Sequence, residues 1–162
     1  MKRKLLVVIL TTTIVGSFCF VLITRALSAP GDLDTTFNST GFARVGFGGG
    51  ENVGQAVLVQ GDGKVVVAGS TTSDIPHTAM LRYNTDGSLD TTFGGVGRGK
   101  LPPDRAQWGA FNAVRIQADN KIVAAGYLTH SIFQTDEAFQ VARFNADGSF
   151  DQTFGIGGQL ET

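Results

Sequence analysis

Oxygen-rich side chains recur at matching positions of two similar segments, NTDGSLDTTFGG and NADGSFDQTFGI. They are Asn84, Asp86 and Asp90 in residues 84–95, and Asn145, Asp147 and Asp151 in residues 145–156. Hard oxygen ligands in a glycine-containing loop are typical of calcium sites. However, the EF-hand spacing with its distant Glu is absent, and turn formation and helix capping account for every one of these positions. We therefore expect structural roles, predict no metal site and no cofactor, and keep calcium binding as an alternative.

Two arginines, Arg82 and Arg143, recur on segments that are otherwise apolar. A buried guanidinium needs charged or hydrogen-bonding partners. The sequence therefore predicts an ion pair or a carbonyl contact for each arginine, with the recurring carboxylates Asp90 and Asp151 as the candidate partners.

Motifs for catalysis are missing. The sequence contains no G-x-S-x-G elbow and no phosphate loop ending in Gly-Lys-Ser/Thr. His77 and His130 lack partners at the spacing of a zinc site or a general base, so we expect exposed loop histidines. Cys19, the single cysteine, lies in an apolar N-terminal run, which leaves the rest of the chain without a thiolate nucleophile. We predict that the chain is not an enzyme; a propeller-type hydrolase is the alternative.

These candidate residues belong to a repeated framework. A phrase of the type G-x-L/F-D-x-T-F starts at Gly31, Gly87 and Gly148. Between these points QAVLVQGDGKVVVAGS returns as NAVRIQADNKIVAAGY, and MLRYNTDG returns as VARFNADG, always in the same order. Self-similarity of this kind indicates a repeat architecture. The boundaries that follow are repeat 1 at about 31–86, repeat 2 at about 87–147, and a partial repeat 3 at 148–162.

Each repeat is predicted to be built from strands. QAVLVQ and KVVVAGS are rich in β-branched residues and are joined by a turn in which Gly63 has Asn120 as its counterpart. Gly and Asn accept positive φ most readily, as a tight hairpin turn requires. TAMLRYN forms a third strand, and a weaker fourth, GFARVGF from Gly41, precedes the hairpin. No window has a sustained helical stripe.

The hairpin strands are apolar on both faces, because Val57 and Val59 point one way and Ala56 and Leu58 the other. Sheets that are covered on both sides by similar sheets suit the blades of a β-propeller. We therefore predict an all-β fold of about two four-stranded antiparallel β-propeller-like blades plus the start of a third, with a β-solenoid as the alternative.

The phrase itself is predicted to form a joint between blades. Ser88 or Asp90 would cap a single helical turn, and Phe93 would be carried inward between neighbouring blades. Phe37 and Phe154 would take the same place in the other two phrases.

Three strings resemble a known repeat: RYNTDGSLDTTFGG, VQGDGKVVVAG and RFNADGSFDQTFGIGG are similar to the delta-sixty repeat of bacterial secreted proteins, which is regarded as β-propeller-like. The resemblance covers residues 31–162. It implies an architecture and an extracellular setting, and it supplies no active-site residues. Closed propellers have about 4–8 blades, so we expect either a longer protein with further repeats or self-association of copies.

The first 29 residues differ from the rest. MKRK gives a basic start, residues 5–23 are uncharged and mostly apolar, and TRALSAP contains small residues. This order predicts a signal peptide or an N-terminal membrane anchor at residues 1–29, ahead of a repeat region at 30–162. We expect the repeat region to be secreted or displayed on the cell surface.

Charge and loop position suggest the class of partner. Four of the 13 basic residues precede residue 30, which leaves nine scattered Lys and Arg against all 14 acidic residues. Nucleic acid is therefore an unfavourable partner. Function on repeat scaffolds tends to lie in divergent loops, such as the one that holds Pro102, Pro103 and Trp108. We expect an exported scaffold of a larger surface protein, for structural display or for binding an unknown protein or glycan; a calcium-stabilised stalk is an alternative.

Overall fold

The computed structural model describes residues 29–47, 50–71, 77–95, 98–100, 108–129 and 137–162. Residues 32–162 form one unit, and the fold below belongs to it. Residues 1–28, which contain nearly all of the predicted signal peptide or anchor and Cys19, lie outside the described residues. In the described part, no helix has the length and hydrophobicity needed to span a bilayer.

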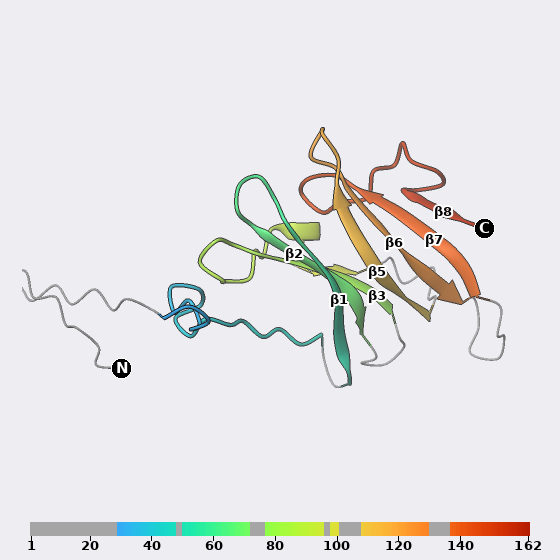
Figure 1. The fold of residues 1–162 in the computed structure, drawn as a ribbon. Helices are drawn as coiled ribbons and strands as arrows, with labels where there is room; N and C mark the ends of the chain where they lie inside the picture. Colours follow the sequence, from blue (N-terminus) through green and yellow to red (C-terminus); the bar gives the residue numbers. More distant parts are fainter. Residues whose placement is uncertain (1–28, 48–49, 72–76, 96–97, 101–107, 130–136) are drawn as a thin grey trace, which may run out of the picture. The chain divides into compact units, whose positions relative to one another are not determined.

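Two four-stranded antiparallel sheets make up the fold (Figure 1). In each sheet the strands lie in chain order, so every strand pairs with its neighbour in sequence. The first sheet contains β1 (Asn52–Val59), β2 (Val65–Thr71), β3 (His77–Tyr83) and β4 (Arg98–Lys100), with a single 3-10 turn, η1 (Phe93–Gly95), before β4. The second contains β5 (Trp108–Ile116), β6 (Ile122–Thr129), β7 (Glu137–Phe144) and β8 (Gln159–Glu161).

The hairpin turns have the geometry that the sequence predicts. Gly63 between β1 and β2 has a φ of 82°, and Asn120 between β5 and β6 has a φ of 64°. Both sheets also carry a register irregularity at the same place in the first hairpin, between Gly54 and Ala56 in one and between Phe111 and Ala113 in the other. The two sheets are therefore copies of one unit, and the chain has the all-β, propeller-like blades that its repeats predict.

The origin of the fourth strand differs from the prediction. GFARVGF was expected to supply it, but residues 42–47 are not in a strand. The fourth strand follows the phrase instead, since β4 pairs with β3 and β8 pairs with β7. By the same pattern, residues 42–47 would need a partner that precedes residue 31, and the described residues contain none. Along the chain, the phrase thus connects two strands of one sheet, and the prediction that the chain passes through it from one sheet to the next is wrong.

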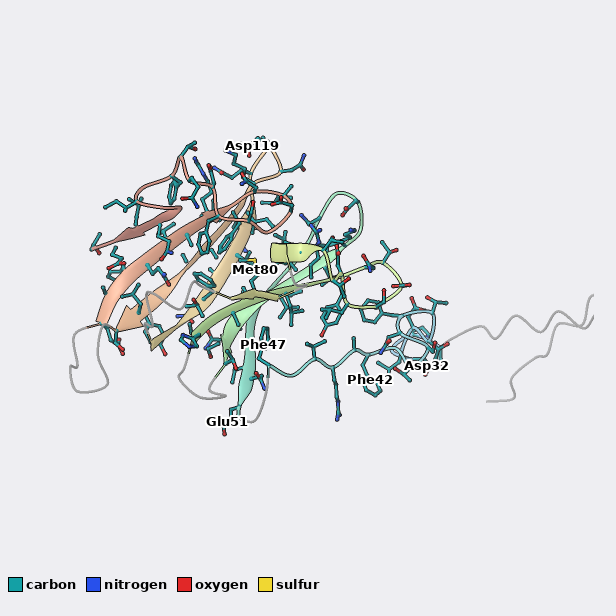
Figure 2. All side chains as sticks on the ribbon, turned by 180° about the vertical axis from the view of Figure 1, so that it is seen from behind. Asp32, Phe42, Phe47, Glu51, Met80 and Asp119 are labelled. Carbon is teal, nitrogen blue, oxygen red and sulfur yellow. The ribbon has the colours of Figure 1, made fainter. Side chains whose placement is uncertain are left out.

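The core lies between the two sheets. β5 contacts β1, β2 and β3, so the first strand of the second sheet packs across the first sheet. Met80, labelled in Figure 2, lies in this core. Its buried members come from both sheets and from η1; they are Val66, Ala68, Met80, Phe93, Phe111, Val114, Ile122, Ala124, Ala142 and Phe144. Burial of these apolar side chains is the main favourable contribution to joining the sheets.

Candidate functional site

The recurring Asn and Asp side chains first build the turn after β3. The amide N–H of Gly87 donates to the carbonyl oxygen of Asn84 at 2.9 Å. Asp86 Oδ1 accepts hydrogen bonds from the amide nitrogen and the hydroxyl of Ser88 at 2.9 and 2.7 Å, and Asn84 Nδ2 donates to the Ser88 hydroxyl. These bonds lower the pKa of Asp86, led by the one from the Ser88 hydroxyl. Side-chain mimicry of a backbone turn explains why Asn, Asp and Ser recur here.

The turn after β7 repeats this arrangement atom for atom. Asn145 Nδ2 donates to the Ser149 hydroxyl at 3.0 Å, and Asp147 Oδ1 accepts from the Ser149 hydroxyl and amide nitrogen at 2.7 and 2.9 Å. The bond from the Ser149 hydroxyl is the main cause of a lowered pKa at Asp147. The two Asn–Asp pairs are therefore structural, as the sequence predicts.

Asp90, in the phrase that starts at Gly87, is the centre of a charged cluster. Its Oδ2 accepts from Lys64 Nζ at 2.7 Å and from Arg82 Nε at 2.8 Å. Its Oδ1 accepts from the Thr92 hydroxyl and amide nitrogen at 2.6 and 3.1 Å, which caps the turn that leads into η1. Burial raises the pKa of Asp90, but the bonds from Lys64 and Thr92 and the charge of Arg82 outweigh it and hold the pKa well below its usual range.

Asp151 has the same four donors in the second sheet. Lys121 Nζ and Arg143 Nε lie 2.8 and 2.7 Å from Oδ2, and the Thr153 hydroxyl and amide nitrogen bond to Oδ1. The bond from Lys121 is the largest of the causes that lower the pKa of Asp151. The predicted arginine–aspartate pairs are confirmed in both repeats, and Asp90, rather than Ser88, provides the predicted cap.

Each arginine also covers the aromatic ring of its phrase. The guanidinium carbon of Arg82 lies 4.6 Å from the ring centroid of Phe93, and that of Arg143 lies 4.6 Å from Phe154. A cation over a ring face is attracted by the ring quadrupole. Asp90 and Asp151 thus orient the arginine, and the arginine in turn holds the Phe of the phrase.

Successive phrases contact each other directly. The Gly94 amide donates to the carbonyl oxygen of Asp147 at 2.8 Å, and a Cβ added to Gly148 would lie 2.7 Å from the Phe93 ring. The preceding pair has the same contact, since the Asn38 amide donates to the carbonyl oxygen of Asp86. Phe93 is fully buried as predicted, whereas Phe37 and Phe154 are half-buried. The phrases form a row in which Phe37 and Phe93 each lie against the Asp–Gly turn before the next phrase, and Phe154 lies at the end of the row.

Arg82 links the first sheet to this row. Its Nη1 donates to the carbonyl oxygen of Ala146 at 2.6 Å and to Gln60 Oε1 at 3.2 Å, in addition to the bond between Nε and Asp90. Its side chain is 9% exposed, against 22% for Arg143. The turn that precedes the following phrase covers Arg82 at Ala146, and this contact accounts for the difference between two otherwise equal clusters.

Two cavities lie beside these elements. One of about 400 Å³ lies between residues 43–47 and the first sheet, and among the described residues Arg44 and Tyr83 are the ionisable ones that line it. The other, of about 440 Å³, lies between the two hairpin turns and is lined by Asp62 and Arg82 together with uncharged groups. Among their described lining residues, neither cavity has a nucleophile beside a base, the pair that covalent catalysis of hydrolysis uses.

The structure describes the position of some of the other candidate residues and not of others. His77 is the first residue of β3, pairs with Thr71 and is 7% exposed, so the prediction of an exposed loop histidine is wrong there. It is buried because the strand starts earlier than the sequence pattern suggested. His130, Pro102 and Pro103 lie outside the described residues, and Trp108 is placed only as the first residue of β5. Within the described ranges, no three His, Cys, Asp or Glu side chains are placed to hold a metal ion.

Sequence reasoning missed the lysines. Lys64 and Lys121 follow the hairpin turns in the matching strings GDGK and ADNK, and each reaches the aspartate of its own sheet. The repeated sequence could have predicted them, because a lysine that recurs at the same position of each repeat, together with a recurring aspartate, is a candidate ion pair.

Comparison with known proteins agrees with this geometry. A family described as a β-propeller domain of unknown function (DUF5122), a family of repeats in bacterial proteins, matches residues 60–93 and 117–154. Each matched segment runs from a hairpin turn to the Phe of the phrase and therefore contains one complete Lys–Asp–Arg cluster. No curated protein and no solved structure matches the chain. The chain thus carries two β-propeller-like repeats.

Proposed function

We propose that the chain is an exported, non-catalytic repeat scaffold that presents its divergent loops to a protein or a glycan. One observation carries the non-catalytic part: both oxygens of Asp90 and of Asp151 accept hydrogen bonds from donors of the same sheet and its connections. A group that acts as an acid, base or nucleophile has to reach a substrate. These carboxylates instead hold the phrase in place, which is a structural task.

Loop position supports a binding role. The repeated strings form the strands and the phrase, whereas the differences between repeats fall in the connections around residues 101–107 and 130–136. On repeat scaffolds such connections often carry recognition. Trp108 starts β5 directly after the first of these connections, and an aromatic side chain is a frequent platform for a partner.

The test is a glycan array probed with the full chain and with Trp108→Ala. We expect one or more glycans to bind the wild type. The affinity of Trp108→Ala for the same glycans should be at least about tenfold lower, because losses of this size are typical when an aromatic contact is removed. Turnover of chromogenic esters or glycosides, scaled with enzyme concentration, would instead support the propeller-type hydrolase. If the chain binds no glycan and hydrolyses no probe, a pull-down with the full chain and with Trp108→Ala separates the two remaining roles: a protein captured by the wild type and lost with the variant supports a protein partner, and no captured protein supports structural display alone.

Export is the second part of the proposal. The basic start, the apolar run at residues 5–23 and the small residues after it support a secreted or surface location. Fractionation of cells that express the full chain is expected to place residues 30–162 outside the cytoplasmic membrane, accessible to added protease. Full protection from protease in intact cells would overturn this part.

A calcium-stabilised stalk is the remaining alternative. At Asp90 a cation would have to displace Lys64, Arg82 and Thr92 from the carboxylate. We therefore expect the melting temperature to be the same in calcium chloride and in EDTA. A rise in the melting temperature with calcium would favour the stalk.

A further inference from the structure

We propose that the chain binds a second copy of itself head to tail, through the outer face of its second sheet and the outer face of its first. The inference deepens the scaffold role by naming one of its partners. The second sheet packs on the first within one molecule, and we propose the same contact between two molecules. The argument therefore compares matching positions of the two sheets.

Strand register defines the two outer faces. Val57 pairs with Val67 and Val67 pairs with Leu81, while their neighbours Ala68 and Met80 lie in the core between the sheets. Side chains alternate between the faces of a strand. Val57, Val67 and Leu81, together with Val59, therefore point away from the second sheet, and we call this set the β1 face.

The second sheet has an outer face of its own. Ala125 pairs with Val141, and their neighbours Ala124 and Ala142 lie in the core. Tyr127 pairs with Phe139 on the same side as Ala125 and Val141. We call this set of four, Ala125, Tyr127, Phe139 and Val141, the β7 face.

The β7 face corresponds to a surface that is covered in the first sheet. Aligning MLRY with VARF makes Val141 the counterpart of Met80, which is 1% exposed, and Phe139 the counterpart of Thr78, also 1% exposed. Val141 is half-buried, and Phe139 is 80% exposed. What covers Met80 is the packing of the second sheet, so the register predicts that another sheet of the same type fits the β7 face.

The β1 face corresponds to the covering surface. Val57 is the counterpart of Val114, which is 1% exposed in the core, yet Val57 itself is 64% exposed. Val59, the counterpart of Ile116, is 63% exposed. Residues 43–47 lie over another part of the β1 face and leave a cavity of about 400 Å³ there. The corresponding face of the second sheet is closely packed against the first sheet instead. Exposed apolar surface of this kind marks interaction sites.

These two faces are the two halves of one contact, which favours another copy over an unrelated partner. A head-to-tail contact of this type is heterologous and leads to a ring if the rotation closes, or to an open row if it does not. Because each copy carries one β1 face and one β7 face, the contact can repeat without any new surface.

The phrases predict a competition within the assembly. Phe154 lies at the end of the row in one copy, and its equivalent position against Asp86 and Gly87 of the next copy is already held by that copy's own Phe37 and Asn38. The incoming phrase would have to take this place. Removing the Phe37 ring, as in Phe37→Ala, should therefore strengthen association.

The experiment is sedimentation velocity of the full chain in a mild non-ionic detergent, which the apolar run at residues 5–23 requires. Val57→Lys blocks the β1 face and Phe139→Lys blocks the β7 face, and both replace exposed side chains, so folding should be retained. We expect concentration-dependent oligomers for the wild type and monomers for each variant alone. The matched control is Leu33→Lys, which replaces an apolar side chain that is 60% exposed and lies on neither face; it should associate as the wild type does.

Mixing the two variants is the decisive step. The intact β7 face of the Val57→Lys copy can bind the intact β1 face of the Phe139→Lys copy. The mixture should therefore give a dimer that grows no further. Formation of this dimer would also show that both variants are folded. The proposal is overturned if the wild type is monomeric at all concentrations, if either variant alone associates as the wild type does, or if the mixture forms no dimer. A monomeric chain that still binds a glycan would leave the proposed function standing.

Discussion

The amide nitrogen of Gly94 lies 2.8 Å from the carbonyl oxygen of Asp147 and donates a hydrogen bond to it. Gly94 directly follows the phrase between β3 and β4, and Asp147 directly precedes the phrase after β7. The bond therefore joins the phrase region of the first sheet to that of the second. Asn38 and Asp86 make the same bond one repeat earlier. Backbone hydrogen bonds next to the phrases thus fix how successive repeats contact each other. The Lys–Asp–Arg cluster of each sheet holds the phrase of that sheet in place.

Gly148 is expected to tolerate no side chain. Its φ is 85°, and a Cβ there would lie 2.7 Å from the Phe93 ring and 2.8 Å from the Gly94 nitrogen. Gly148→Ala should lower the free energy of unfolding by about 2 kcal/mol or more, measured by urea denaturation. The matched control is Gly157→Ala, which also has a positive φ, 63°, but whose Cβ would meet only Gln152 Oε1 at 3.8 Å, so the loss should be about 1 kcal/mol. Equal effects at the two positions would contradict the stacking of phrases.

The two hairpin turns predict a coupled substitution. In the first repeat a Cβ on Gly63 would lie 2.9 Å from Thr85 Cγ2, whereas in the second repeat Asn120 has Ala146 at the position of Thr85. Gly63→Asn alone should therefore be destabilising, and adding Thr85→Ala should restore most of the loss. A double-mutant cycle of melting temperatures measures the coupling. Strictly additive effects would show that the two side chains do not meet.

Acid should weaken the charged clusters. The pKa values of Asp90 and Asp151 are lowered in the folded chain, so the stabilisation they give is complete above the unfolded Asp value of about 3.9 and is lost as the pH falls below it. We expect the free energy of unfolding to decrease between about pH 5 and pH 2.

The variant Asp90→Asn assigns part of this pH dependence. It should flatten the profile in the acid range and cost about 3 kcal/mol at neutral pH, because it leaves Lys64 and the buried Arg82 without their counter-charge. Asp62→Asn, in the exposed hairpin turn, is the control and should keep the wild-type profile. A profile for Asp90→Asn that matches the wild type would contradict the role assigned to this cluster.

Sequence reasoning predicted those parts of the fold that each repeat determines locally. The positive φ at Gly63 and Asn120, the pairing of Arg82 with Asp90 and the burial of Phe93 all follow from residue types at recurring positions. What it misplaced depends on pairing between distant segments: the chain was expected to pass through the phrase into the next sheet, whereas β4 returns to pair with β3. The burial of His77 depended in the same way on where β3 starts, which the local pattern did not determine.

The central claim, that the phrases hold neighbouring sheets together, is tested most directly by truncating two phenylalanines of the same motif. Phe93 is fully buried against the following phrase, and Phe154 is half-buried with the same arginine contact. Urea denaturation of Phe93→Ala should show a loss of about 3–5 kcal/mol in the free energy of unfolding, and Phe154→Ala a loss of about 1 kcal/mol. Equal losses in the two variants, or a larger loss for Phe154→Ala, would contradict the claim.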